Sequence, residues 1–304
     1  MSLRLDLHSH SFHSGDSRLS PREMVRLARA RGLNGLAVTD HETVQGGLEA
    51  RAGNTDPDFL VIPGVEYATE HGHVVGLFLE RELDGLPVRT KPSDKIGRVS
   101  FDQVVQAIHA QGGIAVLAHP FQARLRLPEG PFSGPQRVDA LEGFNARAAA
   151  VRNPLANEQA MAFAGERGIP AVGGSDAHLA AELGRGYCRV DGLDPGAAGD
   201  GGSGAAGGGG PASAGDVRAA ILAGRTTPQG RNSPRTVIPL SQVNRMLTSG
   251  RFGKAPRVMI RLLLTALGPP GLWLENRLRG PLREPPREPL GRPPKEPPKE
   301  PPPR

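Results

Sequence analysis

The chain has 304 residues, 38% of them hydrophobic, which is enough for a buried core in one large domain or two small ones. The single cysteine, Cys188, excludes an internal disulfide, and the first residues lack the apolar run of a signal peptide, so we expect a cytoplasmic protein. The net charge of +6 is concentrated in the C-terminal part, which makes it weak evidence for nucleic-acid binding.

Alternating apolar and polar residues predict a strand over Leu3 to His10. Ser20, Pro21 and Glu23 then form a helix-capping pattern, and a helix is expected from there to about Arg31. The same criteria assign the later elements. Strands are predicted over residues 35–39, 60–68, 73–79, 114–118, 140–145 and 170–174, and helices over 100–111, 157–167 and 216–223.

Strands and helices therefore alternate over the first part of the chain, up to about residue 190. This alternation implies a parallel sheet with covered faces, and about seven repeats are enough to close or nearly close a barrel. We expect an α/β fold with a barrel-shaped sheet. An open doubly wound sheet is the alternative.

Three segments after residue 193 differ in composition from the rest. Residues 194–215 are almost entirely Gly, Ala, Ser and Pro, which predicts a flexible insertion. Residues 236–280 are basic and contain the apolar run 258–267, which is too short to span a membrane and indicates an amphipathic helical segment. Residues 281–304 are rich in Pro, Arg, Lys and Glu and are expected to form a disordered tail.

Histidines and carboxylates follow the predicted strands. His8 and His10 are two residues apart on a strand, so both imidazoles leave the same face, and Asp176 and His178 repeat this spacing. Because strand ends of one polarity meet at one rim of a parallel barrel, residues that are far apart in sequence become neighbours there. The other candidates near strand ends are Asp40, His41, Glu66, His71, His73 and His119.

Any one of these short motifs would more often be a surface feature than a ligand set. Together they carry more weight, because every histidine except His109 lies near a predicted strand end. Imidazole and carboxylate ligands without thiolate suit Zn, Mn or Fe and leave coordination positions open for water and substrate. The sequence therefore predicts a catalytic metal site.

These residues also carry a family resemblance. Short motifs occur in the order Asp-Leu-His-Ser-His (6–10), Thr-Asp-His (39–41), Gly-Val-Glu (64–66), His-Val-Val-Gly-Leu (73–77), Ala-His-Pro (118–120) and Gly-Ser-Asp-Ala-His (174–178). In this order they resemble the PHP family, the polymerase and histidinol phosphatase domains. The match covers residues 1 to about 190, and the spacing is most similar to the stand-alone TrpH-like branch.

The resemblance implies a distorted (β/α)7 barrel over residues 1–193, with 216–235 as the end of a PHP-associated region. It also implies two or three divalent metal ions, Mn, Zn or Fe. One ion would be held by His8, His10, Glu66 and Asp176. Glu66 would bridge to a second ion completed by His73 and His119, and a third would be held by Asp16, His41 and His178. The loop around Asp16 also allows an alignment shifted by one position.

The expected chemistry follows from the ions. A water shared between two cations loses a proton near neutral pH, and the resulting hydroxide can attack phosphorus. We assign catalytic roles to Glu66 as the bridge, to His178 as the group that protonates the leaving oxygen, and to Asp40. Asp40 is expected to accept a hydrogen bond from the imidazole of His41 and so to fix its tautomer.

Arginines after strand ends are candidates for binding a second phosphate of the substrate. They are Arg124, Arg126, Arg147 and Arg185. His71 matches no invariant position of the family, and we expect it to contact the substrate or the metal ligands.

The predicted function is hydrolysis of a phosphorylated small molecule or a short nucleic-acid end, as in nucleoside bisphosphate phosphatases and 5'-to-3' exonucleases. A phosphatase similar to histidinol phosphatase is the nearest alternative. A different class of function is a non-enzymatic adaptor, in which the basic segment and the Pro-rich tail bind an anionic surface or a Pro-binding partner.

Overall fold

The computed structural model describes residues 2–91, 93–94, 96–123, 127, 129–134, 136–193, 212–249 and 258–260. One mixed sheet forms the centre of the molecule, with the strand order β7-β6-β5-β4-β3-β2-β1-β8-β9. The strands are β1 (Leu3–Asp6), β2 (Gly35–His41), β3 (Leu60–Ala68), β4 (His73–Leu77), β5 (Ile114–Ala118), β6 (Ala140–Asn145), β7 (Ala171–Gly174), β8 (Gly186–Val190) and β9 (Thr226–Gly230).

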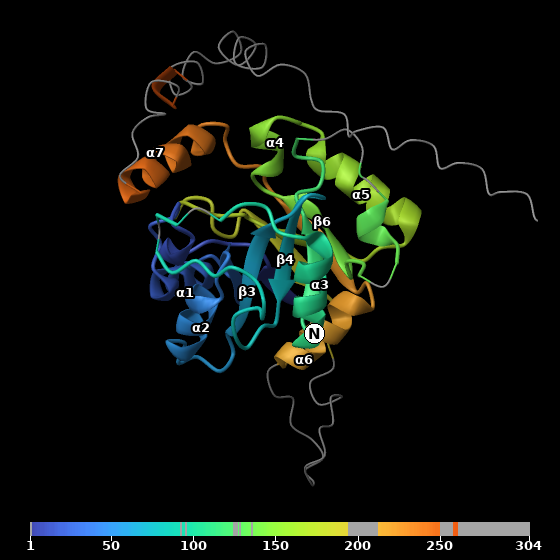
Figure 1. The fold of residues 1–304 in the computed structure, drawn as a ribbon. Helices are drawn as coiled ribbons and strands as arrows, with labels where there is room; N and C mark the ends of the chain where they lie inside the picture. The colour runs from blue at the N-terminus through green and yellow to red at the C-terminus, as the bar shows by residue number, and fades with distance from the viewer. Residues whose placement is uncertain are drawn as a thin grey trace, which may run out of the picture.

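Most of the helices connect successive strands, and several of them lie against the outside of the sheet (Figure 1). They are α1 (Pro21–Ala30), α2 (Gln45–Ala52), α3 (Phe101–Ala110), α4 (Ala148–Val151), α5 (Ala156–Arg167), α6 (Ala214–Leu222) and α7 (Val237–Ser249), with short 3-10 turns at Phe12–Ser14 and Gly130–Phe132. In Figure 1, α6 lies at one end of the molecule, and α4 and α7 lie at the other.

The sheet curves until β7 meets β1, so strands β1 to β7 form a nearly closed barrel. The amide of Leu7 donates to the carbonyl of Gly173 at 3.3 Å, and the amide of Asp176 donates to the carbonyl of His8 at 2.7 Å. An isolated parallel bridge between Ser9 and Ala177 continues this seam. The α/β barrel prediction is confirmed, and the open sheet is not formed.

The prediction of a parallel sheet is wrong for three strands. β4 runs antiparallel to both of its neighbours, β8 is antiparallel to β1, and β9 is antiparallel to β8. β4 turns back because only a tight turn separates it from β3, in which the amide and the hydroxyl of Thr69 both donate to the carbonyl of Gly72. So short a connection permits only an antiparallel pair.

Helix starts agree with the capping patterns. The Ser20 side chain accepts the amide of Glu23 at 3.2 Å, with Pro21 as the first helical residue, and Ser100 caps α3 in the same way. The sequence patterns did not predict α2, β8 or β9. The first strand is shorter than predicted, since β1 ends at Asp6 rather than His10.

The C-terminal predictions are covered only in part. α7 lies in the predicted helical segment 236–280, whose residues 250–257 and 261–280 are outside the described part of the chain. The insertion predicted over 194–215 is described only from residue 212, and the predicted tail over 281–304 lies outside. Among the helices that the structure describes, none is long and apolar enough to cross a membrane.

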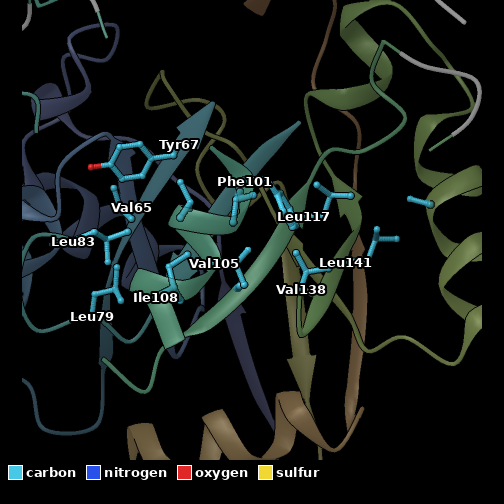
Figure 2. Close-up of a cluster of buried hydrophobic side chains, with 14 of the residues drawn as sticks. Val65, Tyr67, Leu79, Leu83, Phe101, Val105, Ile108, Leu117, Val138 and Leu141 are labelled. Atoms are coloured by element: carbon cyan, nitrogen blue, oxygen red, sulfur yellow. The ribbon is translucent and has the colours of Figure 1, made fainter. Parts of the chain in front are cut away.

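The largest apolar cluster fills the space between the sheet and α3 (Figure 2). Val65 and Tyr67 of β3 and Leu117 of β5 face Phe101 and Ile108 of α3, and all five side chains are fully buried. Each such side chain contributes about 1.5–3 kcal/mol of transfer free energy. This packing fixes β3, β4 and β5 relative to one another, and with them the residues at their ends.

Ile108 packs directly against the backbone of β4. A Cβ added at Gly76 would lie 2.8 Å from Ile108 Cγ1, so the glycine leaves the space that this side chain fills. We predict that Ile108→Ala lowers the free energy of unfolding by about 2–5 kcal/mol, because it leaves a cavity in the core. Urea denaturation followed by circular dichroism measures this change.

Leu222→Ala is the matched control, since Leu222 ends α6 and is 41% exposed. It should cost less than about 1 kcal/mol. Equal losses in the two variants would contradict the account of the core.

Candidate metal centre

Glu66 is at the centre of a ring of imidazoles at one rim of the barrel. Its Oε1 lies 2.7 Å from His73 Nδ1 and 3.0 Å from His119 Nε2. Its Oε2 lies 3.0 Å from His41 Nδ1 and 3.4 Å from His10 Nε2. The carboxylate is 1% exposed. One buried side chain therefore contacts histidines from four separate segments of the chain.

The strand directions explain this convergence. β2 ends at His41, which pairs in register with Glu66 of β3. β4 begins at His73, which pairs with Ala68 on one side and Ala118 on the other. Because β4 is antiparallel, its first residue lies at the same rim as the last residues of its neighbours. His73 thus reaches the expected rim by a route that the parallel prediction did not contain.

Asp176 provides the second carboxylate. Its Oδ1 lies 3.3 Å from His10 Nε2, 3.9 Å from His8 Nε2 and 3.5 Å from His178 Nδ1. The backbone of Asp176 has a φ of 53°, a left-handed conformation that is uncommon outside glycine. This φ is sustained where the segment after β7 closes the barrel on β1.

Asp16 provides the third carboxylate, from the loop after the first 3-10 turn. Its Oδ2 lies 3.4 Å from His41 Nε2 and 3.5 Å from His178 Nε2, and within the described residues its buried Oδ1 has no hydrogen-bond partner. A buried carboxylate oxygen without a donor is costly. The structure brings Asp16 to the ring, although its alignment is ambiguous in the sequence.

The arrangement fits divalent cations. Three sets of side chains each offer ligand atoms within 4.8 Å of one another. The sets are His10 with His41 and His178, His8 with Glu66 and His119, and His8 with His10 and Asp176. They contain nitrogen and oxygen donors only, the donor set that Zn, Mn and Fe accept. The unpartnered oxygen of Asp16, beside His41 and His178, is a further atom that could coordinate a cation.

The ionisation states of Glu66 and His10 fit metal binding. Burial alone would raise the pKa of Glu66, but the imidazoles of His73, His8 and His41 outweigh it and hold that pKa well below its usual range. Burial, with the charges of His178 and His41, lowers the pKa of His10 to about 3. Glu66 is therefore ionised and His10 is neutral at physiological pH, which are the forms that bind metal.

Glu142 lies directly behind the ring and was not identified from the sequence. Its Oε1 lies 3.0 Å from His8 Nδ1, and its Oε2 accepts the amide of His119 at 2.7 Å and the side-chain amide of Asn145 at 2.9 Å. A carboxylate on Nδ1 orients the ring and leaves Nε2 directed into the site. The only sequence signal was a lone acidic residue within the apolar strand β6.

Asp40 is fully buried behind the ring, but its contacts differ from the prediction. It accepts hydrogen bonds from the Ser11 amide at 2.6 Å, the Ser11 hydroxyl at 2.7 Å and the Ser14 hydroxyl at 2.8 Å. The predicted hydrogen bond from the His41 imidazole is replaced by this set. Asp40 acts on His10 instead, since the Ser14 Oγ lies 2.9 Å from His10 Nδ1.

Ser14 can satisfy all of its hydrogen-bonding capacity in this position. Its hydroxyl donates to Asp40, and its two lone pairs accept the His41 amide at 3.0 Å and the N–H at His10 Nδ1. This pattern leaves His10 Nε2 without a proton and facing Glu66 and Asp176. Sequence reasoning missed Ser14 because its role depends on three segments meeting in space.

The candidate substrate-binding residues are in different places. Arg147 is buried at the rim, where it ion-pairs with Glu182 at 3.2 Å, donates to the Ser241 hydroxyl at 2.6 Å and contacts His178 Nδ1. Arg185 donates to the carbonyl of Asn232 and lies in a different pocket, so its prediction as a phosphate clamp at this site is wrong.

His71, a further candidate, does not enter the ring. His71 lies against Phe101, with ring centroids 5.4 Å apart, and does not line the cavity at the rim. Arg124 and Arg126 are outside the described residues.

A cavity of about 220 Å³ opens above the ring. One of its walls is α7, which contributes Ile238, Ser241, Gln242 and Arg245. These residues lie beyond the motifs that located the ligands, and only the amphipathic pattern of the helix pointed to this segment. The remaining lining residues are Asp16, His41, Glu66, His73, His119, Gln122, Arg147, Val151, Asp176 and His178.

A ring of imidazoles and carboxylates at one rim of an α/β barrel defines the class of metal-dependent hydrolases. Comparison with known families places the chain within this class. The model of the PHP domain matches residues 6–119, and the model described as PHP-associated matches residues 154–226. The chain belongs to the PHP family of metal-dependent phosphoesterases.

Similar proteins include an uncharacterized protein of Methanocaldococcus jannaschii, 30% identical over 39% of this chain and 68% of that protein. A 5'-3' exoribonuclease of Haemophilus influenzae is 40% identical, with 27% of this chain and 31% of that enzyme covered. A 3',5'-nucleoside bisphosphate phosphatase of Chromobacterium violaceum is 33% identical over 36% of this chain and 40% of that enzyme.

Among solved structures, PsfC of Pseudomonas syringae PB-5123 has a similar fold, with a TM-score of 0.54 and 17% identity. The match covers 81% of this chain and 98% of that protein.

The hydrogen bonds of Ser14 predict a measurable effect on metal affinity. Ser14→Ala should weaken binding of Mn²⁺ or Zn²⁺ by about 10–100-fold, because His10 loses the partner that fixes its orientation. Isothermal titration of metal-free protein gives the two affinities. Ser17→Ala is the control, since Ser17 is buried in the same loop and accepts only the amide of Leu19. Unchanged affinity in Ser14→Ala would contradict the role of the hydroxyl.

Proposed function

We propose that this chain hydrolyses phosphate esters of nucleotides, acting as a nucleoside bisphosphate phosphatase or a 5'-to-3' exonuclease of the TrpH-like branch. The observation that carries the proposal is the contact of both Glu66 oxygens with histidines of four different segments. A buried carboxylate in this position can bridge two cations. Two such cations can bind the phosphate of an ester from both sides.

The ligand sets implied by the family resemblance are supported by the contacts around each carboxylate. His8, His10, Glu66 and Asp176 would hold one ion. Glu66, His73 and His119 would hold a second, and Asp16, His41 and His178 would hold a third. When bound, such ions activate a water and neutralise charge on the phosphate oxygens.

The side chains of this chain orient the reactants. The Arg147 guanidinium contacts His178 Nδ1 and the carbonyl of Asp176, and the Glu182 carboxylate accepts the backbone amide of His178 at 3.1 Å. His178 faces the cavity. Where no third ion is bound, it is the group that we assign to protonate the leaving oxygen, and with a third ion bound a metal-bound water would take that role. The phosphate of a substrate would then lie between His178 and the two oxygens of Glu66.

The size of the cavity favours a terminal phosphate. A volume of about 220 Å³ accommodates a phosphate with an adjoining sugar, and no Phe, Tyr or Trp is among its lining residues in the described part of the chain. The base would therefore extend toward solvent rather than stack on a ring. The 5'-3' exoribonuclease and the 3',5'-nucleoside bisphosphate phosphatase to which the chain is similar are both named for nucleotide substrates.

α7 supplies groups that can recognise such a substrate. Gln242 and Arg245 line the cavity on the side opposite the strands. A guanidinium suits a second phosphate, which a bisphosphate or an oligonucleotide carries and histidinol phosphate lacks. This is the observation that favours nucleotides over the alternative substrate.

Two further predictions concern the compartment and the adaptor function. The free, buried Cys188 supports a reducing compartment such as the cytoplasm. The adaptor function depends on the residues after 260, which are outside the described part of the chain.

The role of Glu66 is tested by Glu66→Gln, which keeps the shape of the side chain and removes its charge. Turnover of a small nucleotide panel with Mn²⁺ should fall on the order of 100-fold or more, because bridging is worth several kcal/mol. The thermal unfolding transition should stay cooperative. Glu80→Gln, on an exposed carboxylate paired with Arg51, serves as control. Turnover near that of the unmodified enzyme would refute the bridge.

The role of α7 is tested by Arg245→Ala. The KM for a nucleoside bisphosphate should rise about 10-fold, because a charge-assisted hydrogen bond is worth about 1.5–3 kcal/mol, while the KM for a monophosphate changes less. Arg235→Ala, just before α7 and outside the cavity lining, is the control. Equal effects of Arg245→Ala on the two substrates would exclude recognition of a second phosphate.

A further inference from the structure

A second pocket, of about 550 Å³, lies on the outer face of the sheet where β8 and β9 follow β1. Four of its lining residues are arginines, and no acidic residue lines it. We call it the arginine pocket. It shares no lining residue with the cavity above the metal centre. The arginines are Arg4, Arg31, Arg185 and Arg231, and Tyr187 lies beside them in the lining.

Among the described residues, the four arginines have no acidic partner. Elsewhere on the surface, arginines such as Arg51 and Arg167 ion-pair with acidic side chains at 2.7 Å and 2.6 Å. Within the described residues, no carboxylate lies within 4 Å of a guanidinium of the arginine pocket. Like charges placed together without anions raise the local potential and concentrate anionic ligands there.

Three of these guanidiniums are held in place by their surroundings. Arg31 Nη1 donates to the carbonyls of Ala180 and Leu183, at 2.7 Å and 2.5 Å. Arg185 Nη2 donates to the carbonyl of Asn232 at 2.7 Å. The guanidinium of Arg4 lies 4.4 Å from the centre of the Tyr187 ring. Groups that are already ordered lose little entropy when they bind a ligand.

One donor of the pocket lacks a partner. Arg185 Nε is buried and makes no hydrogen bond to any residue that the structure describes. A buried N–H without an acceptor is unfavourable, and a bound group with free oxygens can satisfy it. Backbone carbonyls already satisfy one nitrogen each of Arg31 and Arg185, which leaves the others for a ligand with several oxygen atoms.

From these observations we propose that the arginine pocket binds phosphate groups, carried by a single-stranded nucleic acid or by a free polyphosphate anion. Arginine is the side chain best suited to phosphate because its planar donors bind two oxygens at once. The volume exceeds that of the cavity at the metal centre, about 550 against 220 Å³, and leaves space for more than one phosphate.

The pocket is joined to the metal centre through the chain itself. Leu183, Gly184 and Arg185 directly follow Glu182, whose carboxylate accepts the amide of His178 at 3.1 Å and pairs with Arg147. A ligand in the arginine pocket would therefore rest against the segment that carries His178. The site is separate from the proposed catalytic one and does not depend on it.

The test compares two double variants that lose the same charge. Arg4→Ala with Arg231→Ala removes two exposed guanidiniums of the pocket that no hydrogen bond in the described structure holds. Arg22→Ala with Arg26→Ala removes two guanidiniums from the outer face of α1. Both line a separate hollow together with Arg29, which ion-pairs with Asp56. In both double variants, turnover of a small phosphate ester by the metal-loaded enzyme should stay within about twofold of the wild-type value. This result shows that both variants fold.

Binding of a fluorescent single-stranded oligonucleotide is measured by anisotropy at several salt concentrations, with pyrophosphate as a second probe. The pocket variant should bind about 10-fold more weakly than the wild type, and the slope of log K against log salt should shrink by about 1.4, or about 0.7 per lost phosphate contact. A parallel loss of pyrophosphate affinity identifies free polyphosphate as a sufficient ligand, and a loss with the oligonucleotide alone identifies the nucleic-acid backbone. Equal losses in the two double variants, or none in the pocket variant, would overturn the proposal.

Discussion

The buried carboxylate of Glu66 is the constraint on which the rest of the site depends. A negative charge that is 1% exposed is tolerated only among positive or hydrogen-bonding groups, and the barrel places imidazoles of four segments around it. Carboxylates behind the ring in turn orient two of its histidines. Glu142 orients His8, and Asp40 orients His10 through Ser14. These contacts fix the orientation of the two rings, so that the Nε2 of each faces the site.

Much of the fold and of the ligand set could be predicted from the sequence. An apolar run indicates a buried strand, and a His or Asp at its end indicates a side chain at the rim of the barrel. His8, His10, Glu66, His119 and Asp176 reach one rim as their placement after strands requires. The direction of β4 could not be predicted in this way. It depends on a tight turn at Thr69, yet His73 still arrives at the rim because the first residue of an antiparallel strand lies beside the last residue of its neighbour.

The failures have a common physical origin in contacts that no local pattern encodes. Asp40 follows a strand and precedes a histidine, but its hydrogen bonds go to serines from another loop. Arg185 precedes β8, which is paired outside the seven strands of the barrel, so its side chain faces Arg4 and Arg231 rather than the ring. α7 reaches the cavity from a part of the chain without motifs. Positions that face the cavity from α7 depend on how that helix packs, which the sequence pattern leaves open.

The account makes one central claim, that the ring binds divalent cations at Glu66. Anomalous scattering from crystals grown with Mn²⁺ or Zn²⁺ tests it most directly. We expect two or three peaks, two of them bound to the Glu66 carboxylate, at about 2.0–2.2 Å from its oxygens and from the nearest imidazole nitrogens. Fully occupied metal found only elsewhere on the protein, or a Glu66 carboxylate turned away from bound ions, would contradict the claim.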